Sequence, residues 1–136
     1  MLLPRTVESI SVARQSLDRI LAAFGVRADC REEIALAVSE ACSNAVRHGE
    51  GESLYELAAE SEDSEFVVTV NDHGPGLPDP PPSVMPGENA LGGRGLALMQ
   101  VTTDTLELRR RHGGGLSVRM FKRLRWTDGA IGGQPP

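Results

Sequence analysis

Residues 77–93, LPDPPPSVMPGENALGG, constrain the fold more than any other stretch of the sequence. They contain five prolines and three glycines. Proline removes a backbone donor and glycine loosens the backbone, so this stretch predicts a long loop and no regular element. A loop of this length within a compact domain is usually functional or disordered. The helices and strands must therefore lie before and after it.

An amphipathic helix is predicted over residues 6–24. Thr6 can cap its start and Gly25 can end it. Apolar residues recur at three- and four-residue spacing, which places them on one face of a helix. The expected buried face consists of Ile10, Ala13, Leu17, Ile20, Leu21 and Phe24.

A second helix is predicted over residues 30–48. Asp29 and Glu32 form a start that resembles a capping box, and Gly49 supplies the stop. The same helical spacing defines its buried face. That face consists of Ile34, Val38, Ala41, Cys42 and Ala45.

The hydrophobic period then changes to the short apolar runs and alternation that are typical of strands, over residues 54–59 and 65–71. The polar stretch ESED, residues 60–63, separates the two strands, so the pair predicts a hairpin. Successive side chains of a strand point to opposite faces. In the second strand one face would carry Phe66, Val68 and Val70, and the other Val67 and Thr69.

After the long loop, the sequence predicts a short helix over residues 94–101 and a hairpin of residues 105–110 and 116–122, joined by RHGGG. Residues 127–136 predict a disordered tail. The rest, residues 1–126, has the size of a single domain. Paired strands with segregated helices indicate an α+β two-layer sandwich, with a mixed or antiparallel sheet and its helices on one face.

The composition narrows the class of partner. A net charge of −5 argues against direct nucleic-acid binding, which usually needs a basic face. Cys30 and Cys42 are interpreted as buried free thiols in a reducing compartment. No stretch fits a secretion signal or a bilayer span. We therefore expect a cytoplasmic protein, not associated with a membrane, that has protein or small-molecule partners.

Polar side chains gather on one flank of the second predicted helix. At about 100° per residue, Glu40, Asn44 and Arg47 project from one side, with His48 adjacent. A solvated polar edge would also explain this pattern. However, asparagine is a mediocre helix former, and Asn44 has no capping role here. An amide oxygen near a carboxylate can serve a hard cation such as Mg²⁺.

Two glycine motifs flank the long loop. In DHGPG, Asp72 ends a predicted strand, while Gly74 and Gly76 allow close approach to the backbone. A simple turn would explain that motif equally well. In LGGRGLALM, residues 91–99, glycines open an apolar helix whose free N–H groups can hold phosphates, or merely cap it. The motif is not a Walker A loop, because Gly-Lys-Ser/Thr is missing.

Taken together and in this order, EACSNAVRH, DHGPG and GGRGL resemble the N box and the two glycine boxes of the GHKL superfamily of ATPases and kinases. The resemblance covers roughly residues 5–125. The small size and the stretch SEACSNAVRHG look most like the anti-sigma-factor serine/threonine kinases of bacteria. The resemblance implies a Bergerat-type ATP-binding fold, with ATP and Mg²⁺ as its cofactors.

The resemblance also implies a role for each matched residue. Asn44 would hold Mg²⁺, and Asp72 would accept the amino group of adenine. Glu40 would be the catalytic general base that takes the proton of the attacking serine hydroxyl. The other implied nucleotide-binding residues are Gly74, Gly76, Gly93, Arg94, Gly95, Leu96 and Ser117, with residues 77–92 as the lid over ATP.

The implied function is that of an ATP-binding anti-sigma factor. It would phosphorylate a serine of an anti-anti-sigma (STAS) partner and sequester a sigma factor. One alternative is a non-catalytic protein-binding regulator on the same fold, and another is a fold that binds no nucleotide. Relatives of this type often form homodimers, which the apolar helix faces permit. Arg47 could equally be a surface residue, and His48 a structural one.

Overall fold

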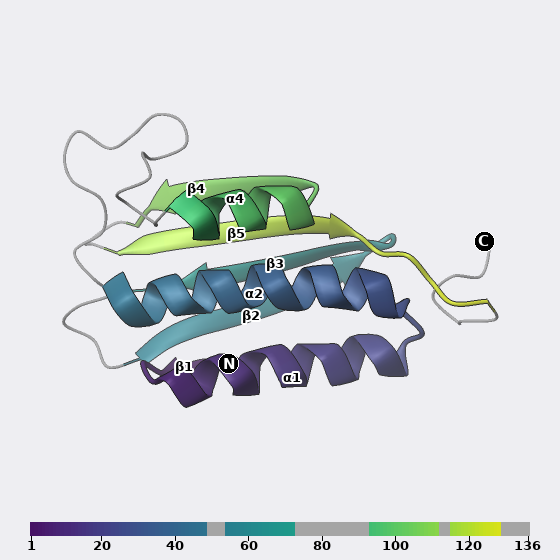
Figure 1. Cartoon of the computed structure of the whole chain (residues 1–136), viewed down its shortest axis with the longest axis horizontal. Helices are drawn as coiled ribbons and strands as arrows, with labels where there is room; N and C mark the ends of the chain where they lie inside the picture. The colour runs from purple at the N-terminus through teal and green to yellow at the C-terminus, as the bar shows by residue number, and fades with distance from the viewer. Residues whose placement is uncertain (49–53, 73–92, 112–114, 129–136) are drawn as a thin grey trace.

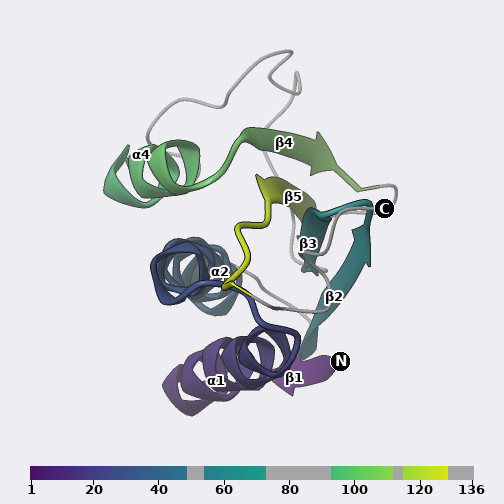
Figure 2. The ribbon, with the colours of Figure 1, turned by 90° about the vertical axis from the view of Figure 1, so that its right-hand side faces the viewer.

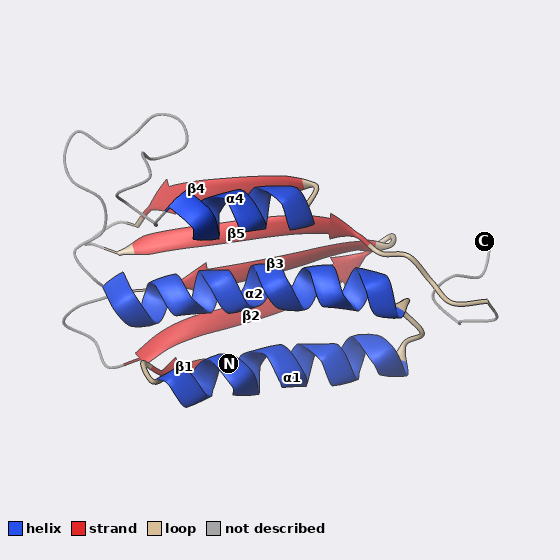
Figure 3. Cartoon of the chain, in the orientation of Figure 1, coloured by secondary structure: helices blue, strands red, loops and turns tan. Residues whose placement is uncertain are grey.

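The computed structural model describes residues 1–48, 54–72, 93–111 and 115–128. These residues form two layers, a sheet and a row of helices that covers one of its faces (Figure 2). The helices are α1 (Val7–Ala23), α2 (Ala28–His48) and α4 (Gly93–Thr102). The strands are β1 (Leu2–Pro4), β2 (Leu54–Glu62), β3 (Glu65–Asn71), β4 (Thr105–Arg110) and β5 (Leu116–Arg123), as Figure 3 shows in red.

The sheet has the strand order β1-β2-β3-β5-β4, and each of these neighbours pairs antiparallel. This confirms the predicted α+β sandwich and narrows the expected mixed or antiparallel sheet to an antiparallel one. β1 is not predicted by the sequence, because three residues are too few to show an alternation. The loop expected over residues 77–92 and the tail from residue 129 onward lie outside the described residues.

Helix α2 is the centre of the helical layer, because it packs against both α1 and α4 and covers β3 and β5 (Figure 1). The predicted buried face is confirmed, since each of its five residues is at most 3% exposed. The helix begins at Ala28, two residues before its predicted start. Arg27 N–H donates to the Arg125 carbonyl, a long-range contact that helps set the start of the helix. Asp29 therefore lies in the first turn, where its Oδ1 accepts from Cys30 N–H at 2.8 Å.

The prediction for α1 is only partly right. Thr6 caps the helix as expected, because its side chain accepts from Ser9 N–H at 3.3 Å. Ala13, Leu17 and Leu21 are buried as predicted, whereas Ile20 and Phe24 are 52% and 60% exposed. Ser9 takes part in that face at 3% exposure. Its hydroxyl lies 2.7 Å from the Tyr55 hydroxyl, which satisfies both buried polar groups.

Both cysteines are free and buried, as predicted. Cys42 on α2 is fully buried, and this burial raises the pKa of its thiol to about 11. Burial likewise raises the pKa of the neighbouring Tyr55 hydroxyl. Both groups therefore stay protonated near neutral pH.

Strands β2 and β3 form the expected hairpin, but the turn is shorter than predicted. Glu62 pairs with Glu65, so the loop contains only Asp63 and Ser64. Their φ angles are 51° and 66°, the sign that a type I′ turn requires at both central positions. The predicted turn at residues 60–63 is therefore wrong, because most of that polar stretch continues β2. The predicted faces of β3 are confirmed, with Phe66, Val68 and Val70 all buried.

The turn leads to a first prediction, for Asp63→Asn. Asparagine tolerates a positive φ better than most residues and is preferred at the first central position of a type I′ turn. The substitution should raise the free energy of unfolding by about 0.5 kcal/mol. Urea denaturation measures this value, and a lower denaturation midpoint for the variant would contradict the turn assignment.

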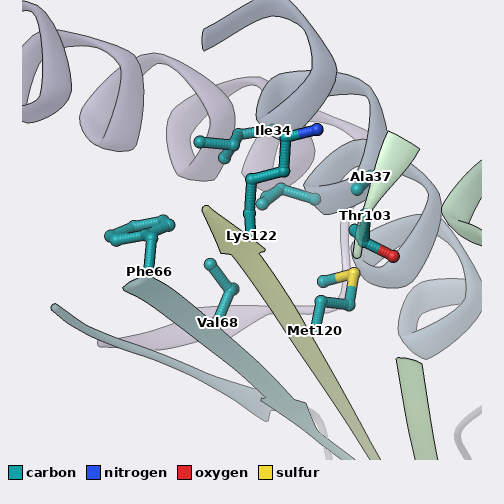
Figure 4. A pocket seen from close by; sticks show the side chains of 8 residues that line it. Ile34, Ala37, Phe66, Val68, Thr103, Met120 and Lys122 are labelled. Atoms are coloured by element: carbon teal, nitrogen blue, oxygen red, sulfur yellow. The ribbon is translucent and has the colours of Figure 1, made fainter. Parts of the chain in front are cut away.

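A buried cation lies on β5, at Lys122. Its side chain is only 8% exposed, and its Nζ lies 3.2 Å from Glu33 Oε2 on α2. Its stem runs among apolar side chains that include Ile34, Phe66 and Met120 (Figure 4). Arg125 also donates to Glu33. The hydrogen bond from Arg125, followed by that from Lys122, lowers the pKa of Glu33 below its usual 4.5.

This cluster predicts a pH-dependent effect of Glu33→Gln. At neutral pH the variant should lose about 1 kcal/mol of unfolding free energy, a small value because Glu33 is 36% exposed. A carboxyl whose pKa is lower in the folded protein stabilises it above the unfolded pKa, and this stabilisation disappears as pH falls through the folded pKa. The difference between wild type and variant should therefore shrink in acid. Urea denaturation at several pH values tests this, and a difference that stays constant with pH would contradict it.

Candidate functional site

Three elements that carry described residues of the predicted motifs reach the same end of the molecule. The C-terminal end of α2, the end of β3 and the start of α4 meet there, on the left in Figure 1. The antiparallel order also brings the start of β5 to this end, beside the end of β3. Segments that are far apart in the sequence therefore lie together at this end.

The first component of this site is a buried amide on α2. Asn44 is only 3% exposed. Its Oδ1 accepts a hydrogen bond from Arg47 Nη2 at 2.8 Å. Its Nδ2 is buried, and no described residue accepts a hydrogen bond from it. A buried donor without an acceptor is costly and rare in folded proteins, which makes this position a candidate for ligand contact.

Glu40 lies one turn before Asn44 on α2 and is half-buried. Within the described part of the chain, no three His, Cys, Asp or Glu side chains gather as a metal centre would require. A metal at this end would take Asn44 and oxygen atoms of the bound ligand as partners. The amide oxygen of Asn44 is a hard oxygen ligand of the kind that Mg²⁺ prefers. Mg²⁺ accepts such sparse protein ligation, because it keeps several waters.

The second component is Asp72, which follows directly after β3 and is 8% exposed. Its backbone N–H donates to the Leu116 carbonyl at 3.0 Å. Its carboxylate Oδ1 accepts from Leu116 N–H at 3.1 Å. Arg111 Nη1 donates to the Asp72 carbonyl at 3.0 Å. These contacts fix the aspartate between β3 and β5, and a carboxylate has further lone pairs for a donor on a ligand.

The third component is the start of α4, which begins at Gly93, one residue before the predicted start. Leu96 and Met99 are 8% and 0% exposed, and α4 packs against α2. The backbone N–H groups in the first turn of a helix favour anions. The Arg94 side chain, Gly74, Gly76 and the lid lie outside the described residues, as does the side chain of His48.

Ser117 does not join the other predicted site residues. Burial alternates along β5, with Leu116 and Val118 buried and Ser117 half-buried between them. Ser117 therefore points to the sheet face that the helices leave open, whereas Asn44 lies in the helical layer. The prediction overlooked the register, and Leu116 lies beside Asp72 in place of the expected hydroxyl.

Two residues beside Asp72, Arg111 and Leu116, are not predicted from the sequence. The alternation of β5 could have identified Leu116, because it shares a face with the buried Val118. No local pattern identifies Arg111, whose contact with Asp72 spans 39 residues.

The described helices include none that is long and apolar enough to cross a membrane.

Comparison with known proteins identifies the family of the chain. Residues 3–122 match the family described as histidine kinase-like ATPase domain. The anti-sigma F factor of Pasteuria penetrans is 33% identical over 68% of this chain and 67% of the relative. The serine-protein kinase RsbW of Bacillus subtilis (strain 168) is 30% identical over 91% of this chain and 84% of the relative.

Solved structures support the same fold. The structure of the RsbU and RsbW domains of Rv1364c from Mycobacterium tuberculosis aligns with a TM-score of 0.66 at 21% identity. The alignment covers 91% of this chain but only 32% of that longer one. The histidine kinase domain of a blue-light activated kinase from Erythrobacter litoralis aligns with a TM-score of 0.56 at 23% identity, over 89% of this chain and 61% of that one. The chain therefore belongs to the histidine kinase-like ATPase family, and within it resembles the anti-sigma-factor serine kinases.

Proposed function

We propose that the protein is an ATP-dependent serine-protein kinase that acts on a STAS-type anti-anti-sigma protein and also binds a sigma factor. The observation that carries the proposal is the buried Asn44 amide, with Glu40 one turn before it and Asp72 at the neighbouring strand end. The names of the relatives, anti-sigma F factor and serine-protein kinase RsbW, support the choice of partners. We place this activity in the cytoplasm and in a single domain, residues 1–126.

In the proposed site, Asp72 accepts the amino group of adenine, and Gly74 and Gly76 let the base approach the backbone. The start of α4, Gly93 to Leu96, directs its N–H groups toward the phosphates. The Asn44 oxygen would hold Mg²⁺, which neutralises phosphate charge when bound. Residues 77–92 would cover the nucleotide.

Phosphoryl transfer requires mainly positioning and charge neutralisation from the protein. The serine oxygen of the partner forms a bond to the γ-phosphorus while the bond to the β–γ bridging oxygen breaks. Glu40 takes the proton of the serine hydroxyl, and ADP leaves with the electrons of the broken bond. The products are phosphoserine on the partner and ADP.

The proposal is tested by incubating the full chain with Mg²⁺, γ-labelled ATP and a STAS partner from the same genome. We expect label on the partner and none on a partner variant whose acceptor serine is alanine. ATP binding without transfer to any STAS partner would refute the kinase proposal. It would favour the alternative, a regulator that binds its partner without catalysis.

A further inference from the structure

The one amide that the proposed site offers to a metal ion is contacted by an arginine. Arg47 Nη2 donates to Asn44 Oδ1 at 2.8 Å, across three residues of the last turns of α2. Residues at this spacing are neighbours on the surface of a helix. Asn44 is 3% exposed, whereas Arg47 is exposed. A buried amide is thus held by a cationic side chain that extends to the surface.

The contact also fixes which way the amide points. A guanidinium has only donors, so the reverse orientation would turn the amide NH₂ toward another donor. In the observed orientation the oxygen faces Arg47, and Nδ2 is buried without an acceptor among the described residues. An oxygen-rich ligand such as a polyphosphate would supply that acceptor. Among the described residues, the Asn44 oxygen is therefore bound to a guanidinium, and its NH₂ group has no acceptor.

The guanidinium of Arg47 and a Mg²⁺ ion would compete for the Asn44 oxygen. Mg²⁺ lies about 2.1 Å from its ligands. With Arg47 2.8 Å away on the same atom, two positive groups would be within roughly 5 Å of each other, where like charges repel. A phosphate offers the guanidinium a better partner, because its oxygens accept two parallel hydrogen bonds from the planar fork.

We propose that the guanidinium of Arg47 takes the place of the metal ion beside Asn44 when no metal is bound. In the free protein it is a positioning residue that holds Asn44 Oδ1, and in the complex it moves to a phosphate oxygen and leaves Asn44 to Mg²⁺. This role rests on the proposed function. If so, Arg47 and Mg²⁺ partly substitute for each other in nucleotide binding. Binding of nucleotide without metal then depends on Arg47 more strongly than binding with metal.

The test compares Arg47→Gln with wild type in titrations with a fluorescent ATP analogue. The dissociation constant is measured in EDTA and in saturating Mg²⁺, and the ratio of the two gives the enhancement by metal. Arg19→Gln, at an exposed position on α1, is the matched control. In Arg47→Gln we expect binding in EDTA to weaken about tenfold and binding in Mg²⁺ less than about threefold. The enhancement by metal should therefore rise in this variant and stay unchanged in the control.

An enhancement in Arg47→Gln that equals or falls below that of wild type would overturn the inference and leave the proposed function standing. A wild-type protein that binds no nucleotide would overturn both. The free state is tested separately by NMR, where the side-chain amide signals of Asn44 should shift in Arg47→Gln and not in Arg19→Gln. No shift would refute the contact. Arg47→Ala replaces the glutamine variant if circular dichroism shows that the latter is unfolded.

Discussion

Asp72→Asn is expected to weaken ATP binding by roughly 10- to 100-fold. Asp72 follows directly after β3 and is 8% exposed. Its carboxylate accepts a hydrogen bond from Leu116 N–H, and its backbone N–H donates to the Leu116 carbonyl. Asparagine keeps the size of the side chain and one oxygen for Leu116. However, it replaces an acceptor by an NH₂ group, which would face the amino group of adenine. The loss should therefore appear in nucleotide affinity and only weakly in stability.

Competition against a fluorescent ATP analogue measures this loss. The matched control is Asp63→Asn, the same chemical change in the turn after β2, which should leave the affinity within about twofold of wild type. Thermal melts of both variants separate affinity from folding. An affinity of Asp72→Asn equal to that of the control would show that Asp72 does not bind the base.

Glu40→Gln should reduce phosphoryl transfer to the partner by roughly 10²- to 10⁴-fold, the usual contribution of a general base. Glutamine has nearly the same size and cannot accept the proton of the serine hydroxyl. Because Glu40 lies one turn away from Asn44, nucleotide binding should stay within about threefold of wild type. Loss of transfer together with retained binding distinguishes a catalytic role from a structural one.

The control for this variant is Glu32→Gln, at an exposed position two turns earlier on α2. It removes the same charge from the same helix and should leave both transfer and binding unchanged. Single-turnover measurement of labelled phosphate on the partner gives the rate of the chemical step. Transfer by Glu40→Gln at the wild-type rate would exclude Glu40 as the base.

The sequence predicts those parts of the fold whose periodicity extends over several turns or alternations. The buried face of α2 and the inward face of β3 agree with the prediction residue by residue. The burial of Ser9 is not predicted, because it depends on a hydrogen bond with the hydroxyl of Tyr55, 46 residues away. Ile20 and Phe24 fit a helical apolar stripe yet remain exposed, since packing partners decide burial and lie far away in the chain.

In the candidate site, too, the sequence indicates some residues and not others. The resemblance to the GHKL boxes indicates Glu40, Asn44 and Asp72. The C-terminal end of α2 and the end of β3, which Asp72 follows, lie at the same end of the molecule. The contact of Arg47 with Asn44 could not be predicted, because helical spacing alone does not distinguish it from a solvated edge. The prediction that Ser117 binds nucleotide does not take the register of β5 into account. A shift of one residue in register moves a side chain to the opposite face of the sheet.

Calorimetric titration of the wild-type chain with ATP and with GTP, both in excess Mg²⁺, tests the central claim most directly. If Asp72 accepts the amino group of adenine, ATP should bind with measurable heat at one site per chain. GTP should bind at least about tenfold more weakly, because its purine carries an oxygen at that position, which would face the carboxylate. No binding of ATP, or equal affinities for the two nucleotides, would contradict the account.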